Sequence, residues 1–406
     1  MLRIFKLLLA GSAAWLCSDV AVLAAASVGN MDKVDVLAVM GRVADWQLQH
    51  MPAKPEIRWE HGALYAGFMA MGDLVADPKY REAMRTIGRA RQWAFETPHT
   101  TWYADHVCVG QMYCELYAID RDPAMIAPLR KLLDEQLAAD RKDGFWWKWA
   151  DAMFMAPPVW TRMFALTGER KYLDFMNRQW WLTAGDLYDG AERLYYRDTR
   201  FREMKESNGA KVFWSRGNGW VMGALVRVLQ GMPADYPDRG KYVTQFQQMA
   251  GRLLEIQPAD GLWRSSLLDP GSYPAPETSG SAFFCYAFAW GVNHGLLDRS
   301  KFEPAIRKAW AGLVGCVDAD GKLTHVQLVG DRPAMVDPTH THLYGVGGFL
   351  LAGSEVYRMG LLRDVPHMSF EAGNSTEQFQ TRKSVEIPEV PLQTIQGRQT
   401  LAPAGK

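Results

Sequence analysis

The chain has 406 residues, of which 48% are apolar and 22% are charged, close to the average for globular proteins. This composition excludes a disordered or fibrous protein, and the length accommodates one large domain or two ordinary ones. The 45 basic and 45 acidic residues cancel, so the basic field of a nucleic-acid-binding protein and the charged stripe of a membrane-surface protein are both missing.

The N-terminus has the pattern of an export signal. Arg3 and Lys6 precede an apolar stretch from residue 7 to 23, and small residues up to Ala26 suit cleavage. Polar residues such as Asp19 interrupt the stretch, which makes a membrane-spanning helix a poor interpretation. We therefore expect a signal peptide at 1–26 and a mature protein that is periplasmic or secreted, not attached to the membrane after cleavage.

From about residue 31 the chain reads as a succession of amphipathic helices. A unit recurs about every 45 to 65 residues, the length of a helical hairpin with its loops. Each unit has a polar loop with aromatic and charged residues, followed by an apolar helix rich in small residues. The six predicted helix starts lie at 59–63, 104–107, 149–153, 215–220, 277–281 and 339–345.

Six apolar helices that alternate with more charged ones predict an all-α fold, an (α/α)6 barrel over residues 31–368. Because one polar loop precedes each inner helix, we expect the six polar loops to gather at one end of the barrel. An open solenoid of helical hairpins has the same local pattern and remains the alternative. The segment 369–406 is polar and lacks helical periodicity, so we expect a non-catalytic tail.

Two carboxylates hold equivalent places in neighbouring units. Asp105 and Asp151 each follow an alanine, precede an apolar helix and have aromatic residues just before them, including Trp147 and Trp149. Paired carboxylates in an aromatic surrounding are typical of acid–base catalysis on sugars, because burial can keep one of them protonated. The alternative is that both aspartates are N-caps of helices.

Arg216 and Trp220 lie in the run Trp-Ser-Arg-Gly-Asn-Gly-Trp before the fourth apolar helix. A guanidinium flanked by indoles suits a sugar that carries a carboxylate. Trp59 lies at the start of the first apolar helix, and we expect it to join this substrate-binding surface.

Four histidines, His61, His106, His340 and His342, fall at the predicted starts of inner helices. We expect them to donate hydrogen bonds to the substrate, with a structural role as the alternative for each. No further His or carboxylate completes a metal site around the His340–His342 pair, and we expect no metal and no organic cofactor.

The motif around Arg216, together with Trp149-Ala150-Asp151-Ala152-Met153, resembles glycoside hydrolase family 105, the unsaturated rhamnogalacturonyl and uronyl hydrolases, which is related to family 88. The resemblance covers residues 34–359 and implies an (α/α)6 barrel. It implies that the substrate is an oligosaccharide ending in an unsaturated uronic acid, whose vinyl ether is hydrated. Asp151 would be the acid and base, Asp105 would hold the substrate and tune Asp151, and Arg216 and Trp220 would bind the uronate.

One departure from the family limits this transfer. Some members carry a His-Trp-Asp pattern in the region of residues 194–205, and this chain does not, so the sugar next to the uronate stays open. Two other functions remain as alternatives: a non-catalytic periplasmic protein that binds oligosaccharides, and an inverting glycosidase that acts on saturated sugars. We expect a monomer or a weak homodimer.

Overall fold

The computed structural model describes residues 33–96, 103–140, 144 and 146–363. The predicted signal peptide and the polar tail from residue 369 onward lie outside these described residues. No helix in the described ranges is long and apolar enough to cross a bilayer.

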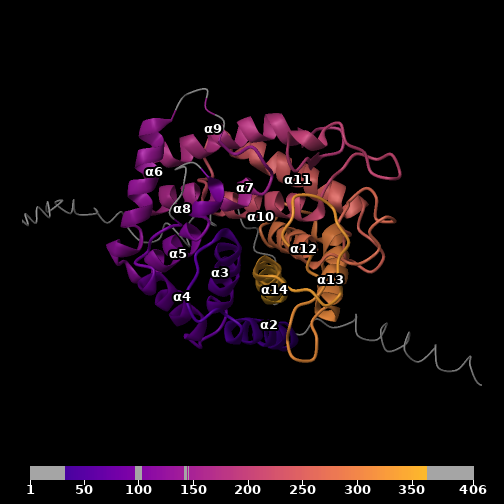
Figure 1. Ribbon diagram of the computed structural model, residues 1–406, viewed down its shortest axis with the longest axis horizontal. Coiled ribbons are helices and arrows are strands. Elements are labelled where there is room, and N and C mark those ends of the chain that lie inside the picture. The colour runs from indigo at the N-terminus through magenta and orange to yellow at the C-terminus, as the bar shows by residue number, and fades with distance from the viewer. Residues whose placement is uncertain (1–32, 97–102, 141–143, 145, 364–406) are drawn as a thin grey trace, which may run out of the picture.

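The described residues form two concentric layers of helices (Figure 1). The inner helices are α3 (Trp59–Gly72), α5 (Gly110–Asp120), α8 (Pro157–Thr167), α10 (Ser215–Gly231), α12 (Thr278–Asn293) and α14 (Leu343–Arg363). The outer helices are α2 (Lys33–Gln49), α4 (Lys79–Ala90), α6 (Ala127–Ala139), α9 (Arg170–Leu187), α11 (Arg239–Glu255) and α13 (Arg299–Gly315).

The inner layer closes on itself. Each inner helix packs against the next in chain order, and α14 returns to pack against α3. This contact between the last and the first inner helix confirms the (α/α)6 barrel and excludes the open solenoid.

Burial separates the two layers as the sequence pattern predicts. Nearly every residue of α12 is buried, whereas α4 buries Tyr80, Met84 and Ile87, which are spaced four and three residues apart on one face. An outer helix therefore contributes one apolar stripe, and an inner helix is enclosed on all sides.

Small residues allow the inner helices to approach closely. A Cβ atom on Gly347 of α14 would lie 2.3 Å from the carbonyl oxygen of Ala63 in α3. A Cβ on Gly280 of α12 would lie 2.3 Å from Oγ of Ser215 in α10. These glycines are required because the helix backbones touch.

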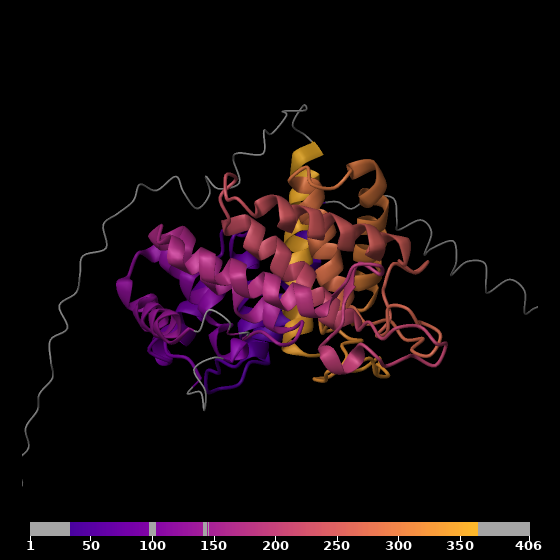
Figure 2. The same cartoon turned by 90° about the horizontal axis from the view of Figure 1, so that it is seen from above.

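The connections before the inner helices gather at one end of the barrel, the lower end in Figure 2. They contain the short helices η1 (Ala104–Val107), α7 (Ala152–Met155) and η3 (Thr199–Phe201), and a two-stranded hairpin of β1 (Tyr188–Asp189) and β2 (Leu194–Tyr195). The short helix η2 (Pro123–Met125) lies instead between the inner helix α5 and the outer helix α6. Backbone hydrogen bonds join the three longest loops, from Ser215 N to the Ser265 carbonyl and from Thr278 N to the His325 carbonyl.

The predicted helix starts are close to those observed at four units and displaced at two. Helices α3 and α10 begin at Trp59 and Ser215, and α12 begins at Thr278. At the second unit, however, Asp105 lies in the turn η1, and α5 begins only at Gly110. At the third unit the short helix α7 precedes the inner helix α8, which begins only at Pro157.

Candidate active site

Asp105 and Asp151 lie at the loop end of the barrel, directly before α5 and α7. Asp105 is half-buried in η1, and Asp151 is only 9% exposed at the start of α7. Neither side chain accepts a capping hydrogen bond from its helix. Asp151 occupies the N-cap position of α7 without making the capping bond, and Asp105 lies inside η1, so capping does not explain the burial of either side chain.

The two carboxyl groups have a shared electrostatic environment that favours protonation. Burial raises the pKa of Asp105 to about 7, and the nearby charge of Asp151 adds to this effect. Burial also raises the pKa of Asp151, against the opposing effects of Arg197 and Arg216. This pair can therefore hold a proton near neutral pH, which isolated aspartates cannot do.

Arg197 reaches the site from the loop between β2 and η3. Its Nε donates to Oδ2 of Asp151 at 3.2 Å, and its Nη1 donates to Oδ2 of Asp198 at 2.9 Å. Its carbonyl accepts from Ala150 N at 2.8 Å. Sequence reasoning assigned no role to Arg197. The only sequence signal is an Arg-Asp pair in the region that departs from the family pattern.

Arg216 lies deeper than the sequence suggested. It is 1% exposed, and its guanidinium carbon lies 4.4 Å from the Trp214 ring centroid and 4.6 Å from that of Tyr344. Its Nη1 and Nη2 donate to the carbonyls of Gln327 and Leu328 at 2.6 and 2.8 Å. Only its Nε lacks a partner among the described residues, so Arg216 fastens the loop before α14 to the start of α10.

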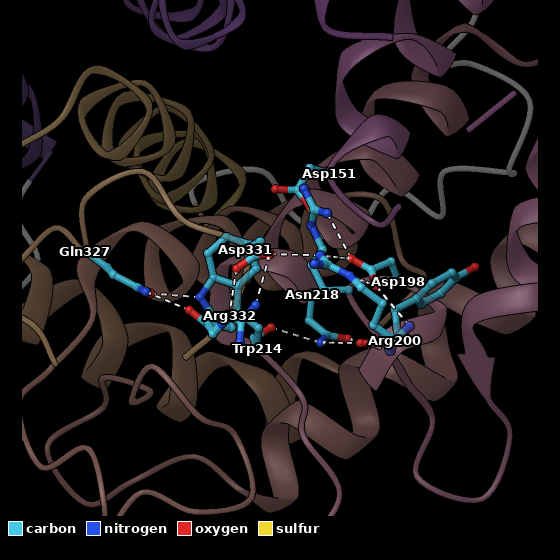
Figure 3. Close-up of polar contacts among 10 residues, drawn as sticks. Asp151, Asp198, Arg200, Trp214, Asn218, Gln327, Asp331 and Arg332 are labelled. Carbon is cyan, nitrogen blue, oxygen red and sulfur yellow. Dashed lines mark hydrogen bonds and ion pairs between the residues drawn. The ribbon is translucent and has the colours of Figure 1, made fainter. Parts of the chain in front are cut away.

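Gln327 is the centre of that loop. Its side chain accepts from Trp214 Nε1 at 2.8 Å (Figure 3). The same side chain accepts from Ser265 Oγ at 3.0 Å, and the Gln327 carbonyl accepts from the Tyr344 hydroxyl at 2.6 Å. These bonds hold the loops before α10, α12 and α14 together at the mouth of the barrel.

Some aromatic residues lie buried beneath the site, and others are accessible beside the carboxyl groups. Trp220 is fully buried, and its ring contacts those of Phe154, Phe283 and Tyr344. Partly buried Trp59 stacks on Tyr344 with ring centroids 5.5 Å apart. The buried ring of Trp220 therefore supports the site from below and presents no face to solvent.

Trp147 and Trp149 diverge although they are two residues apart. Trp147 is 3% exposed, and its ring packs edge-on against Phe175 of α9. Trp149 is partly buried, and its ring lies 5.0 Å from that of Tyr103, which is 45% exposed. The accessible aromatic wall beside the carboxylates is thus formed by Tyr103 and Trp149, whereas Trp147 belongs to the core.

The histidines also differ in depth. Burial lowers the pKa of His61 to about 4 and likewise that of His342 to about 4, so both are neutral at neutral pH. Their Nδ1 atoms are buried without a partner in the described residues. His106 lies against Tyr103, with ring centroids 5.3 Å apart. His340 sits further out, and its Nε2 lies 3.6 Å from Asp337.

Glu60 is a second buried group that sequence reasoning did not select. Burial raises its pKa, and its Oε2 has no hydrogen-bond partner in the described residues. Together with His61 and His342, it gives the site several buried polar atoms that a polyhydroxylated ligand could satisfy. Among the described residues, no three His, Cys, Asp or Glu side chains are grouped as metal ligands.

Comparison with known proteins identifies the family of the chain. A sequence model described as Glycosyl Hydrolase Family 88 matches residues 32–360. A relative from Formosa agariphila named unsaturated 3S-rhamnoglycuronyl hydrolase is 39% identical over 351 residues, which cover 81% of this chain and 92% of the relative.

Two solved structures share both sequence and fold with this chain. A family 88 glycosyl hydrolase from Bacteroides vulgatus is 32% identical, with a TM-score of 0.76 over 80% of this chain and 99% of that one. A protein described as a polysaccharide lyase is 30% identical, with a TM-score of 0.78 over 83% and 99%.

The motifs resemble family 105 and the related family 88; the family model confirms family 88, and a structural neighbour described under family 105 shares the barrel fold. With its family match and a closely similar relative over most of its length, the chain belongs to glycosyl hydrolase family 88 and is a glycoside hydrolase.

Proposed function

We propose that this protein removes the terminal 4,5-unsaturated uronic acid from oligosaccharides made by polysaccharide lyases, by hydrating the C4=C5 double bond. The observation that carries this proposal is the pair Asp105 and Asp151, two carboxyl groups with raised pKa values at the mouth of the barrel. The name of the Formosa agariphila relative supports an unsaturated uronyl substrate.

In this reaction Asp151 donates its proton to C4, and positive charge develops at C5 and the ring oxygen. Water adds to C5 and returns a proton to the Asp151 carboxylate. The resulting hemiketal opens, and the next sugar leaves with a free hydroxyl group. Burial favours the proton on Asp151 before the reaction, and one water molecule is consumed without net change of the enzyme.

The charges around this carboxyl also suit the uronate. Arg197 and Arg216 both lower the pKa of Asp151 through their positive charge, and the same field attracts the carboxylate of the substrate. Tyr103 and Trp149 offer the exposed aromatic surface on which a sugar ring can stack. We propose rhamnose as the sugar next to the uronate, because the relative's name specifies a rhamnoglycuronyl substrate.

The test follows the ultraviolet absorbance of the conjugated enoate in unsaturated rhamnose-containing, pectic and glycosaminoglycan oligosaccharides. Wild type should remove the absorbance, and Asp151→Asn should be slower by about 100-fold or more, the usual contribution of a general acid. In deuterated water the product should carry deuterium at C4. Glu135→Gln, at an exposed position on α6, is the matched control and should retain wild-type activity.

Each alternative gives a different result. Cleavage of saturated oligosaccharides without loss of absorbance would identify an ordinary glycosidase. An increase of absorbance with a polysaccharide would identify an eliminating enzyme, the activity for which one structural relative is described. Binding without turnover would support the oligosaccharide-binding alternative, and equal rates for wild type and Asp151→Asn would remove Asp151 from the mechanism.

We also propose that the protein is exported and acts in the periplasm or outside the cell, as a monomer or a weak homodimer. The basic and apolar pattern of residues 1–26 supports export. Substrates that lyases release from extracellular polysaccharides would be met in that compartment.

A further inference from the structure

A chain of charged side chains connects Asp151 with the loop before α14 (Figure 3). Arg197 bonds Asp151 at 3.2 Å and Asp198 at 2.9 Å. Arg200 then holds both oxygens of Asp198, at 2.9 and 2.8 Å, and reaches Asp331 at 2.8 Å. Negative and positive side chains therefore alternate from Asp151 to Asp331, in the loop before α14 that Arg216 also binds.

Backbone contacts fix Arg197 and Asp198, the part of this series nearest to Asp151. Asp198 is in an extended conformation, and its Oδ1 accepts from Arg200 N at 3.0 Å, which starts η3. The Arg197 carbonyl accepts from Ala150 N, the residue before Asp151. Arg197 is therefore bound to the Asp151 segment through both its main chain and its side chain, which leaves the guanidinium little freedom.

Arg197 divides its charge between two carboxyl groups. An arginine that faced Asp151 alone would hold that group as a carboxylate, whereas a general acid has to carry a proton. Asp198 accepts a hydrogen bond from Nη1 of Arg197 and is only 8% exposed. Its negative charge therefore compensates part of the guanidinium charge. Asp151 is thereby oriented by Arg197 without being locked in its ionised form.

We propose that Arg197 is the positioning residue of Asp151 and that Asp198 balances the charge of Arg197 so that Asp151 can act as an acid. This inference rests on the proposed function, and it adds two residues to which the sequence motifs assigned no role. Arg200 completes the arrangement by holding Asp198 from the far side.

Other charged and titratable groups also face Asp151 from neighbouring elements. They are Asp105 in η1, Arg216 in α10, Tyr103 before η1 and Tyr344 in α14. Variants at Arg197 and Asp198 leave all four in place, so the comparison between those variants isolates the effect of the Arg197 charge.

The two variants should shift the pH profile in opposite directions. Activity that requires protonated Asp151 falls as pH rises through its pKa. Arg197→Gln removes a cation, raises that pKa and should move the alkaline limb of kcat up by about one pH unit or more. Asp198→Asn leaves the Arg197 charge uncompensated, so the limb should move down.

The experiment measures kcat and KM against pH for wild type, Arg197→Gln, Arg197→Lys and Asp198→Asn, with melting temperatures to confirm folding. Arg197→Gln should also lose about tenfold or more in kcat, and Arg197→Lys should keep the wild-type limb and recover part of the rate. Arg170→Gln, an exposed arginine on α9, is the control and should leave the profile unchanged.

The inference would be overturned if both Arg197→Gln and Asp198→Asn lowered kcat but left its alkaline limb at the wild-type pH. Residues with a purely structural role would give that outcome. If this occurs while Asp151→Asn is inactive, the proposed function stands and only the role of Arg197 is rejected. If Asp151→Asn retains full activity, the proposed function fails, and the inference fails with it.

Discussion

Asp105 and Asp151 occupy equivalent positions in the sequence, yet different groups surround them. Arg197 contacts Asp151 directly, whereas Asp105 is influenced mainly by its burial and by the charge of Asp151. The carboxylate pair therefore has an unequal arrangement, in which one member has a fixed hydrogen-bond partner and the other carries a pKa near neutrality.

This inequality predicts how stability depends on pH. The pKa of Asp105 is raised from 3.8 to about 7, so the folded state binds more protons than the unfolded state between about pH 4 and pH 7. The free energy of unfolding therefore falls as pH rises through this window. Asp105→Asn removes the buried charge and should be more stable than wild type at pH 8, by up to about 4 kcal/mol for about three pKa units.

Urea unfolding at pH 4 and pH 8 tests this prediction. The difference between Asp105→Asn and wild type should be near zero at the lower pH and largest at the higher pH. A gain of the same size at both pH values would mean that packing, not ionisation, is responsible. A loss of stability at pH 8 would contradict the prediction outright.

Local sequence identified the two aspartates but not their environment. An apolar pattern marks the helix after each aspartate, and this signal lies within a few residues. The bond between Arg197 and Asp151 spans 46 positions and depends on how two loops meet at the barrel mouth. Likewise, the loop that carries Trp147 and Trp149 is irregular, so no period predicts which indole faces inward.

At the scale of elements, the inner helices were predictable because burial on all sides requires a continuous apolar composition with small residues. Their contacts were not predictable in the same way. Gly347 appears in the sequence as one of several glycines in α14, and only the structure shows that it lies against the backbone of α3 at Ala63. The start of α5 was misplaced because Asp105 lies in a separate turn, η1, that precedes that helix.

Gly347→Ala should therefore weaken the contact that closes the barrel. The new Cβ would lie 2.3 Å from the Ala63 carbonyl oxygen and 2.9 Å from the Leu64 Cα, and these backbone atoms cannot rotate away. Overpacking of this kind costs about 1–3 kcal/mol, and we expect such a decrease in the free energy of unfolding by urea.

Gly240→Ala is the matched control, because Gly240 lies in the outer helix α11 and a Cβ there would meet nothing within 4 Å. That substitution should stabilise the protein by up to about 1 kcal/mol, the helix preference of alanine over glycine. If Gly347→Ala were equally harmless, the close approach of α14 and α3 would not limit stability.

At the scale of the whole molecule, the closed ring explains why distant segments form one site. The loops before α10, α12 and α14 meet because these helices are neighbours in the ring, and Arg216 binds the carbonyls of residues 327 and 328. Closure adds the first unit, since Trp59 of α3 stacks on Tyr344 of α14. The six-unit repeat was visible in the sequence, but closure requires the contact between α14 and α3, which lie at opposite ends of the described chain.

The positions of the exposed apolar side chains bear on the oligomeric state. The large apolar side chains exposed on the described surface are Tyr103, Ile119, Leu182, Met204, Leu328, Val329 and Met335. Five of them belong to loops at the mouth, whereas Ile119 and Leu182 lie apart on α5 and α9. A stable dimer buries about 800 Å² on each partner, and an interface built on these five side chains would cover the mouth of the barrel.

We therefore expect the mature protein to be monomeric under assay conditions. Separately, the signal pattern predicts that the protein isolated from its own cells begins near residue 27. Light scattering coupled to size-exclusion chromatography should give the mass of one chain, and specific activity should stay constant on dilution. Mass spectrometry of the N-terminal peptide tests the cleavage. A dimer that stays active without dissociating would place its interface away from the mouth, because a dimer that buries Tyr103 and Leu328 would exclude the substrate from Asp151.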